Sequence, residues 1–235
     1  MAAVLVAMPG RAFFAQEATS VAARPEVTFH FERAAVAVPR YSLTIFEDGS
    51  GVYQGDAVSL GTIETAGPMG SLAGAATQPF REPVSVAPAT AKRIFSMTKS
   101  LKNFNISCAS KAKNVADTGT KTLSYKGSNG QGECTYNYSE NKTVVQVADL
   151  FLGVAETMDE GRRLDHLHRY DRLGLDAAIN SFATEVSEGR AVELGTIAGT
   201  LRSIAADTEV MQRVRLKASQ LLSLLPPEMQ RTAAQ

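Results

Sequence analysis

The segment Tyr41–Gly55 (YSLTIFEDGSGVYQG) constrains the fold more than any other part of the chain, because its pattern predicts a β-hairpin. Apolar side chains alternate along its first half, as one face of a half-buried strand requires, at Tyr41, Leu43 and Ile45. Asp48-Gly49 interrupts this run before a second strand begins at Val52. Asp-Gly between two alternating runs favours a tight turn, since glycine adopts a positive φ without steric cost. The sequence therefore predicts an antiparallel sheet built around this hairpin.

More strands and one helix are expected on either side of the hairpin. Alternating apolar residues predict strands from Glu26, over Pro79–Val86, and in a second hairpin over Thr120–Lys126 and Glu133–Tyr138. Pro88–Phe104 has an apolar face at helical spacing and a proline suited to the first turn. The Gly- and Ala-rich stretch 61–76 is expected to be a loop. Residues 26–140 are thus predicted to form an α+β module, a small antiparallel β-sheet with one packed helix.

From residue 141 the pattern changes to helix. Apolar residues recur at helical spacing through Val144–Met158, Leu175–Val186, Val192–Ile204 and Val210–Leu222. Asp207-Thr208 is expected to cap the last of these segments, and Pro226-Pro227 to end it. We predict an all-helical region of antiparallel helix pairs over residues 141–225, followed by a disordered tail over residues 226–235.

The first residues predict export. Ala2–Met8 is a short apolar run, followed by small and aromatic residues up to Ala15-Gln16, as at the end of a secretory signal peptide. Residues 1–25 are therefore expected to be signal-like or disordered. The protein is expected to be periplasmic or secreted, with a cytoplasmic location as the alternative. No transmembrane span is predicted, because no run reaches the roughly 20 apolar residues that such a helix needs.

The chain has two cysteines, Cys108 and Cys134. In an oxidising compartment they can form one disulfide, and otherwise they are two buried thiols. Neither has a histidine nearby in the sequence, and the chain has no C-x-x-C motif. A redox or metal-binding role is therefore not expected for them.

The whole-chain charge argues against binding to nucleic acid, because 24 basic and 24 acidic residues cancel. The charge is nevertheless uneven, since residues 88–142 hold nine basic side chains and three acidic ones. This surplus allows the modules to attract one another, or the segment to face an unidentified protein or an anionic partner with Lys92 and Lys99 of the predicted helix as contacts. The alternative is that these lysines only solubilise the outer face of the helix.

A second polar cluster lies at Gly161–Arg172 (GRRLDHLHRYDR). Its two histidines are two residues apart and project in different directions on a helix, whereas zinc-binding helices space them by four. Spacing by four instead pairs Asp165 with Arg169 and Arg162 with His166, as on a solvent-exposed helix. The alternative is a partner-docking face made of Arg162, Arg163, His166 and Arg169.

No catalytic, cofactor-binding or metal-binding residue is predicted. The chain has no G-x-S-x-G elbow, no G-x-G-x-x-G motif and no P-loop. His30 lies on the polar side of its predicted strand and can act as a base only beside a nucleophile. The acidic pairs Glu47-Asp48 and Asp159-Glu160 are expected at a turn and a helix junction, where solvation and capping explain them.

The hairpin also carries a resemblance. YSLTIFEDGSGVYQG resembles the Y-x-L-T-I-x-x-D-G-x-x-x-Y-x-G hairpin of a domain family of unknown function in secreted bacterial proteins. The order of elements agrees over residues 26–140, with a helix and further strands after the hairpin. Cysteines that precede this hairpin in some members are missing here, where residues 35–39 read AVAVP. The resemblance implies no activity and no catalytic residue.

These patterns together favour a non-enzymatic interaction module in an exported protein. Its expected binding surfaces are the helix Pro88–Phe104, an exposed face of the sheet, or the arginine-rich helix near His166. Two alternatives stay open. One is a hydrolase with its site between the two modules and His30 or His166 as base. The other is a small-ligand or lipid carrier whose cavity is lined by the apolar face of Val144–Met158.

Overall fold

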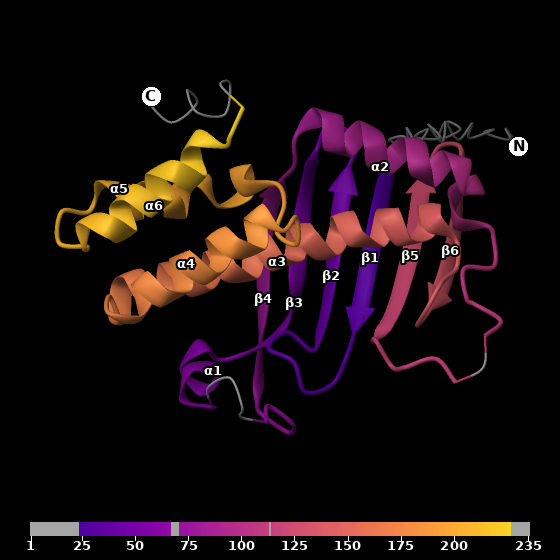
Figure 1. The fold of residues 1–235 in the computed structure, drawn as a ribbon. Coiled ribbons are helices and arrows are strands. Elements are labelled where there is room, and N and C mark those ends of the chain that lie inside the picture. Colours follow the sequence, from indigo (N-terminus) through magenta and orange to yellow (C-terminus); the bar gives the residue numbers. More distant parts are fainter. Residues whose placement is uncertain (1–23, 67–70, 113, 227–235) are drawn as a thin grey trace, which may run out of the picture.

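The computed structural model describes residues 24–66, 71–112 and 114–226, and these residues form one antiparallel sheet with helices (Figure 1). The strand order across the sheet is β4-β3-β2-β1-β5-β6. The six strands are β1 (Glu26–Glu32), β2 (Arg40–Phe46), β3 (Ser50–Val58), β4 (Thr77–Ser85), β5 (Thr120–Gly127) and β6 (Gly130–Tyr136). The predicted α+β fold, an antiparallel sheet followed by a helical C-terminal region, is confirmed.

The predicted hairpin is the β2–β3 pair. Leu43 lies opposite Tyr53, and Ile45 lies opposite Gly51. Gly49 has a φ of 83° and donates its N–H to the carbonyl of Phe46 at 2.9 Å, which closes the turn. The hairpin predicted from Asp48-Gly49 is therefore confirmed, and its turn uses a backbone conformation that glycine adopts freely.

The sheet has one apolar face and one polar face. Side chains of the apolar face are buried, among them Val27, Phe29 and Leu43. The opposite face carries hydroxyls and an imidazole that bond across strands: Thr28 to Thr44 at 2.9 Å, and His30 Nδ1 to the Ser42 hydroxyl at 3.0 Å. This division follows from the period-two alternation of strand side chains.

Two helices cross the apolar face (Figure 1). They are α2 (Pro88–Ser100) and the 29-residue α3 (Lys142–Tyr170). Asn141 caps α3, since its side chain accepts from the backbone N–H groups of Thr143 and Val144. Phe151 of α3 stacks on Phe29 with ring centroids 5.6 Å apart. The hydrophobic core of the sheet therefore continues into the first half of α3.

The remaining helices lie beside the β4 edge of the sheet (Figure 1). They are α4 (Gly174–Ser187), a 3₁₀ turn at Leu194–Ile197, α5 (Ala198–Ala206) and α6 (Gln212–Ser223). Asp207 does not cap α6 as expected, because that helix begins five residues later at Gln212. Its carboxylate accepts the backbone N–H of Glu209 in the preceding loop instead.

Local expectations differ from the structure in two places. A short helix, α1 (Leu60–Ala66), lies inside the stretch predicted as a loop, and the Ser59 carbonyl accepts the N–H groups of Thr62 and Ile63 in its first turn. The helix predicted to reach Phe104 ends at Ser100 and is followed by a 3₁₀ turn over Lys102–Phe104. The sequence did not predict α1, because the small residues of this low-complexity stretch show little helical periodicity of apolar side chains.

Several expectations concern residues that the structure does not describe. The signal-like segment falls on residues 1–23 except for its last two positions, and the expected tail falls on residues 227–235 except for Pro226. Within the described ranges, no helix combines the length and the hydropathy that crossing a bilayer requires.

Cys108 and Cys134 are joined by a disulfide, with their Cα atoms 5.7 Å apart and both side chains buried. The bond fastens the segment after α2 to strand β6. In the chain-entropy account, closing a loop of this length restricts the unfolded chain and thereby stabilises the folded one.

Removing the disulfide is expected to lower the free energy of unfolding by about 3 kcal/mol. The comparison is between the oxidised protein and the double variant Cys108→Ala/Cys134→Ala, by urea denaturation. A thiol count on the denatured, unreduced protein is the control. Two free thiols, or equal stability of the two proteins, would contradict the expectation.

Candidate functional site

Two neighbouring cavities flank the connection between β1 and β2 (residues 33–39) where it faces α3. The first has a volume of about 580 Å³ and the second about 500 Å³. Both are lined by Ala37, Val38 and Asp159. We call the two cavities together the α3 groove, because one helix forms a wall of both.

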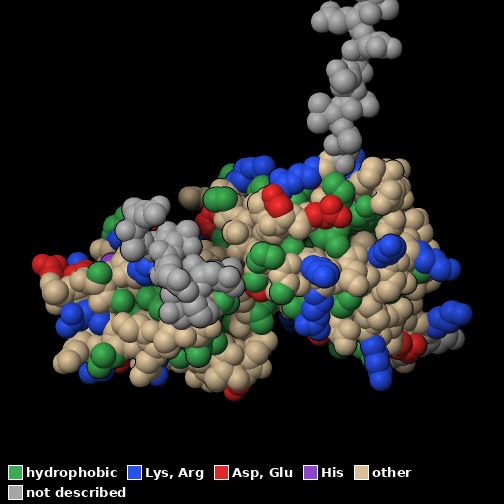
Figure 2. Space-filling model, turned by 90° about the horizontal axis from the view of Figure 1, so that it is seen from above, with side chains coloured by type: hydrophobic (Ala, Val, Ile, Leu, Met, Phe, Trp, Pro, Cys, Tyr) green, Lys and Arg blue, Asp and Glu red, His purple; other side chains and the backbone are tan. Residues whose placement is uncertain are grey.

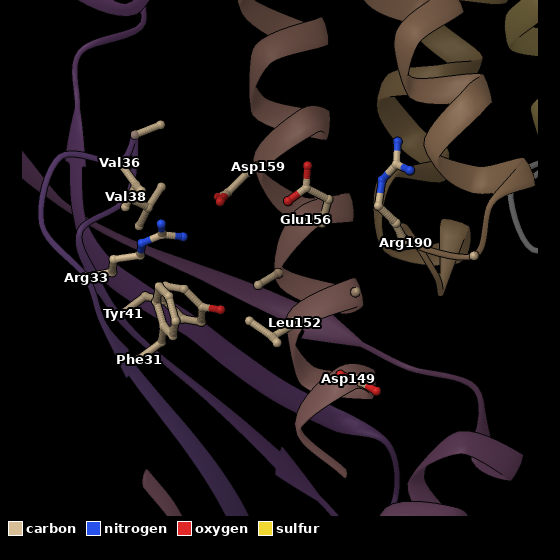
Figure 3. Close-up of a pocket in the computed structure, with 14 residues that line it drawn as sticks. Phe31, Arg33, Val36, Val38, Tyr41, Asp149, Leu152, Glu156, Asp159 and Arg190 are labelled. Atoms are coloured by element: carbon tan, nitrogen blue, oxygen red, sulfur yellow. The ribbon is translucent and has the colours of Figure 1, made fainter. Parts of the chain in front are cut away.

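The first cavity combines apolar walls with charged groups (Figure 3). The rings of Phe31 and Tyr41 lie on the sheet side with centroids 5.3 Å apart. Leu152 lies across from them on α3. The charged lining residues are Arg33 from the β1–β2 connection, Asp149, Glu156 and Asp159 from α3, and Arg190 from the segment after α4.

Asp159 joins the sheet to α3. Its Oδ1 accepts hydrogen bonds from the Tyr53 hydroxyl at 2.9 Å and from Arg162 Nη2 at 2.6 Å. The Arg162 guanidinium also lies over the Phe80 ring, 3.9 Å from its centroid. Burial raises the pKa of Asp159 to about 6, although Arg162 and the Tyr53 hydroxyl act in the opposite direction. The carboxylate is thus held by donors from two elements, β3 and α3.

The second cavity brings together three of the predicted partner-binding residues. Arg162, Arg163 and His166 all line it, opposite Leu60 and Ile63 near α1. Arg163 lies 3.8 Å from Glu160, and the His166 ring contacts Tyr170 with centroids 5.0 Å apart. The arginine-rich part of α3 therefore lies at the groove and is not merely a solvated helix face.

The other predicted residues lie elsewhere. Arg169 forms the predicted ion pair with Asp165 at 2.8 Å. The predicted pair between Arg162 and His166 is wrong, because Arg162 turns toward the sheet and binds Asp159. Lys92 and Lys99 are exposed on α2. Figure 2 looks onto this side of the molecule and shows its Lys and Arg side chains scattered rather than gathered in one patch.

The three histidines have separate surroundings. His166 lines the groove, whereas His168 Nε2 lies 2.9 Å from the Asp207 carboxylate near the α5–α6 loop. His30 lies on the polar face of the sheet, between Ser42 and Glu32. Among the described residues, none of the three is hydrogen-bonded to another histidine or to a cysteine.

Glu156, which lines the first cavity, belongs to a cluster of three carboxylates. Ligand oxygens of Glu156, Glu160 and Glu185 lie within 4.8 Å of one another. Burial raises the pKa of Glu160 to about 7, and the charges of Glu185 and Glu156 add to this shift. Such a cluster can share a proton, and its hard oxygen ligands suit a divalent cation such as Ca²⁺ or Mg²⁺.

Sequence reasoning missed the acidic side of the groove. Asp159-Glu160 was expected at a helix junction, but α3 runs through both residues without a break. Their chemistry was hidden because Glu185 and Tyr53 approach them only in the folded chain. The available signal was the spacing of Glu156 and Glu160, which places both on one helix face.

No protein-family model, no curated protein and no solved structure matches the chain. The groove is therefore interpreted from its chemistry alone. It offers apolar surface, two types of charge and hydrogen-bonding groups in one concave site, which is the composition of a ligand-binding site.

Proposed function

We propose that this is an exported, non-enzymatic binding protein, and that the α3 groove is its binding site. The observation that carries the proposal is the pair of adjoining cavities, which share Ala37, Val38 and Asp159. Concave sites between layers of secondary structure are where proteins commonly bind ligands and peptide segments. Arg162, Arg163 and His166, expected from the sequence as partner contacts, line the second cavity.

The disulfide supports the exported part of this proposal. Disulfides form and persist mainly in oxidising compartments such as the periplasm and the extracellular space. The bond between Cys108 and Cys134 agrees with the signal-like run at Ala2–Met8. Both features point to a binding partner outside the cytoplasm.

Two observations favour binding over the alternatives. A hydrolase with its site between the two modules would need His30 or His166 beside a nucleophile there. Within the described residues no serine, threonine or cysteine bonds to His166, and His30 bonds to Ser42 on the polar face of the sheet, outside the groove. A lipid carrier would need the apolar face of Val144–Met158 to line a cavity. Val144, Val147 and Phe151 are instead buried in the core, and Ala155 is the residue of that face that lines the first cavity.

Photocrosslinking tests the proposal. The full chain carries p-benzoylphenylalanine in place of Val36, which lines the first cavity, and is exported from its producing cells. We expect a covalent adduct on this protein, detected by mass spectrometry. The control carries the same group in place of Leu216, which is exposed on α6 away from the groove.

A groove-filling substitution sharpens this test. Ala37→Trp places an indole where both cavities meet and is expected to abolish the adduct at position 36. Leu216→Trp adds the same ring on the surface and is expected to leave the adduct unchanged. Equal labelling at positions 36 and 216, or labelling that Ala37→Trp does not reduce, would overturn the proposal.

A further inference from the structure

Tyr41 is a buried residue whose hydroxyl opens onto the first cavity. The residue is 5% exposed and lines that cavity, with its oxygen directed toward α3 (Figure 3). Within the described residues it makes no hydrogen bond. Burial raises the pKa of Tyr41, so the group stays protonated and can donate. A ligand in the cavity can therefore accept a hydrogen bond from this hydroxyl.

The charges around this hydroxyl lie on two sides. Figure 3 shows Arg33 on the same side of the cavity as Tyr41, with Glu156 across from them on α3. Asp149 lines the cavity from the same helix. Among the described residues, neither Arg33 nor Glu156 nor Asp149 makes an ion pair. Burial raises the pKa of both carboxylates, although Lys121 acts in the opposite direction on Asp149 and Arg190 does so on Glu156.

A ligand that matches this arrangement needs charges of both signs. A carboxylate would be bound by the Arg33 guanidinium and the Tyr41 hydroxyl, because charge-assisted hydrogen bonds are the strong ones. An ammonium group would be bound by Glu156, with Asp149 two turns away on α3 adding negative charge to that side of the cavity. Between them, the walls formed by Phe31, Val38 and Leu152 require an apolar body.

We propose that the first cavity binds a short apolar peptide through its free amino and carboxyl ends. The proposal rests on the proposed function, since it names the ligand class of the α3 groove. The ammonium end lies toward α3, and the carboxylate end lies toward Arg33 and Tyr41. The side chains of the peptide fill the apolar middle of the cavity.

Three forms of one dipeptide test the proposal by isothermal titration calorimetry. Leu-Phe has both charges, N-acetyl-Leu-Phe lacks the ammonium, and Leu-Phe amide lacks the carboxylate. We expect the free dipeptide to bind about tenfold more tightly than either capped form, since a hydrogen bond to a charged group is lost in each. Equal affinity of all three, or tightest binding by a capped form, would overturn the proposal.

Variants that remove one charge test which residue binds each end of the peptide. Arg33→Gln is expected to bind the free dipeptide and its amide equally, because the carboxylate has lost its partner. Glu156→Gln is expected to reduce the preference over the acetylated form. Both residues are exposed, so neither change disturbs the core. Arg93→Gln on α2 and Glu133→Gln on β6 remove the same charges elsewhere and are expected to change nothing.

Tyr41→Phe removes only the hydroxyl and keeps the buried ring. It is expected to weaken the two forms with a free carboxylate and to leave the amide unchanged. If all variants bind the peptides like the unaltered protein, the assignment of the ends is wrong.

The two proposals fail in different ways. An adduct at position 36 that Ala37→Trp removes, together with no binding of any dipeptide, would overturn the peptide proposal and leave the binding function standing. Absence of both would overturn the two together.

Discussion

Gly51→Ala is expected to lower the free energy of unfolding by about 3 kcal/mol, the upper end of what an overpacked interior costs. A Cβ atom at Gly51 would lie 2.1 Å from the Thr44 carbonyl oxygen on the neighbouring strand. It would also lie 2.8 Å from Val84 Cγ1 and 2.9 Å from Ile45 Cδ1. Thr44 belongs to β2, which is paired with β1 and β3, so its backbone has little room to yield.

Gly199→Ala is the matched control for this substitution. Gly199 lies in α5, and nothing lies within 4 Å of a Cβ added there. Because alanine favours helix over glycine by up to about 1 kcal/mol, this variant is expected to be as stable as the unaltered protein or slightly more stable. Urea denaturation measures both. A similar loss at the two positions would contradict the argument from the close approach at Gly51.

Arg162→Leu is expected to lower the free energy of unfolding by about 2 kcal/mol, less than for a fully buried ion pair because this pair is only partly buried. The Arg162 side chain is 21% exposed, and its loss removes a hydrogen bond to Asp159 and the contact with Phe80. Asp159 would keep only the Tyr53 hydroxyl as a partner. The negative charge of the Asp159 carboxylate, between α3 and the sheet, would then be only partly compensated.

Arg169→Leu is the control for this second substitution. Arg169 lies two turns further along α3, its side chain is 63% exposed, and it pairs with Asp165. Exposed pairs of this kind contribute about 0.5 kcal/mol or less. Comparable losses of unfolding free energy in the two variants would show that the contacts of Arg162 with Asp159 and Phe80 add nothing to the stability of the fold.

The loss caused by Arg162→Leu is also expected to depend on pH. The pKa of Asp159 is raised to about 6, so at lower pH the carboxyl is protonated and has no charge to leave unpaired. Denaturation at a pH above and a pH below this value should therefore show a smaller loss at the lower pH. Adding Asp159→Asn should recover part of the loss above it, as a double-mutant cycle would show.

Residues close in the sequence determined much of the sheet. Asp48-Gly49 specified the turn, and the alternation at Tyr41, Leu43 and Ile45 specified which face is buried. Both signals are local, because a positive φ and a period of two depend only on neighbouring residues. The same holds for the pair Asp165–Arg169, whose spacing of four joins neighbours on any helix.

The groove required the tertiary structure. Tyr53 and Asp159 are 106 positions apart, and their hydrogen bond forms only because α3 crosses the sheet above β3. Arg162 binds Asp159, its i,i+3 neighbour on α3, rather than His166. Helix spacing allows both pairs, and the contacts of Asp159 with Tyr53 and of Arg162 with Phe80, made across elements, accompany the first. Likewise Arg33, Tyr41 and Glu156 show no joint pattern in the sequence, because they lie on a loop, a strand and a helix.

The sequence by itself thus determined the hairpin, the strand alternation, the helical C-terminal region and the cysteines available for a disulfide. Each depends on conformational preferences or apolar spacing within a short stretch of chain. Only the tertiary structure decided where α3 lies on the sheet, which charges face the cavities and which hydroxyl is left without a partner. Those features depend on side chains that distant segments bring together, and a polar residue carries no local sign of what will lie opposite it.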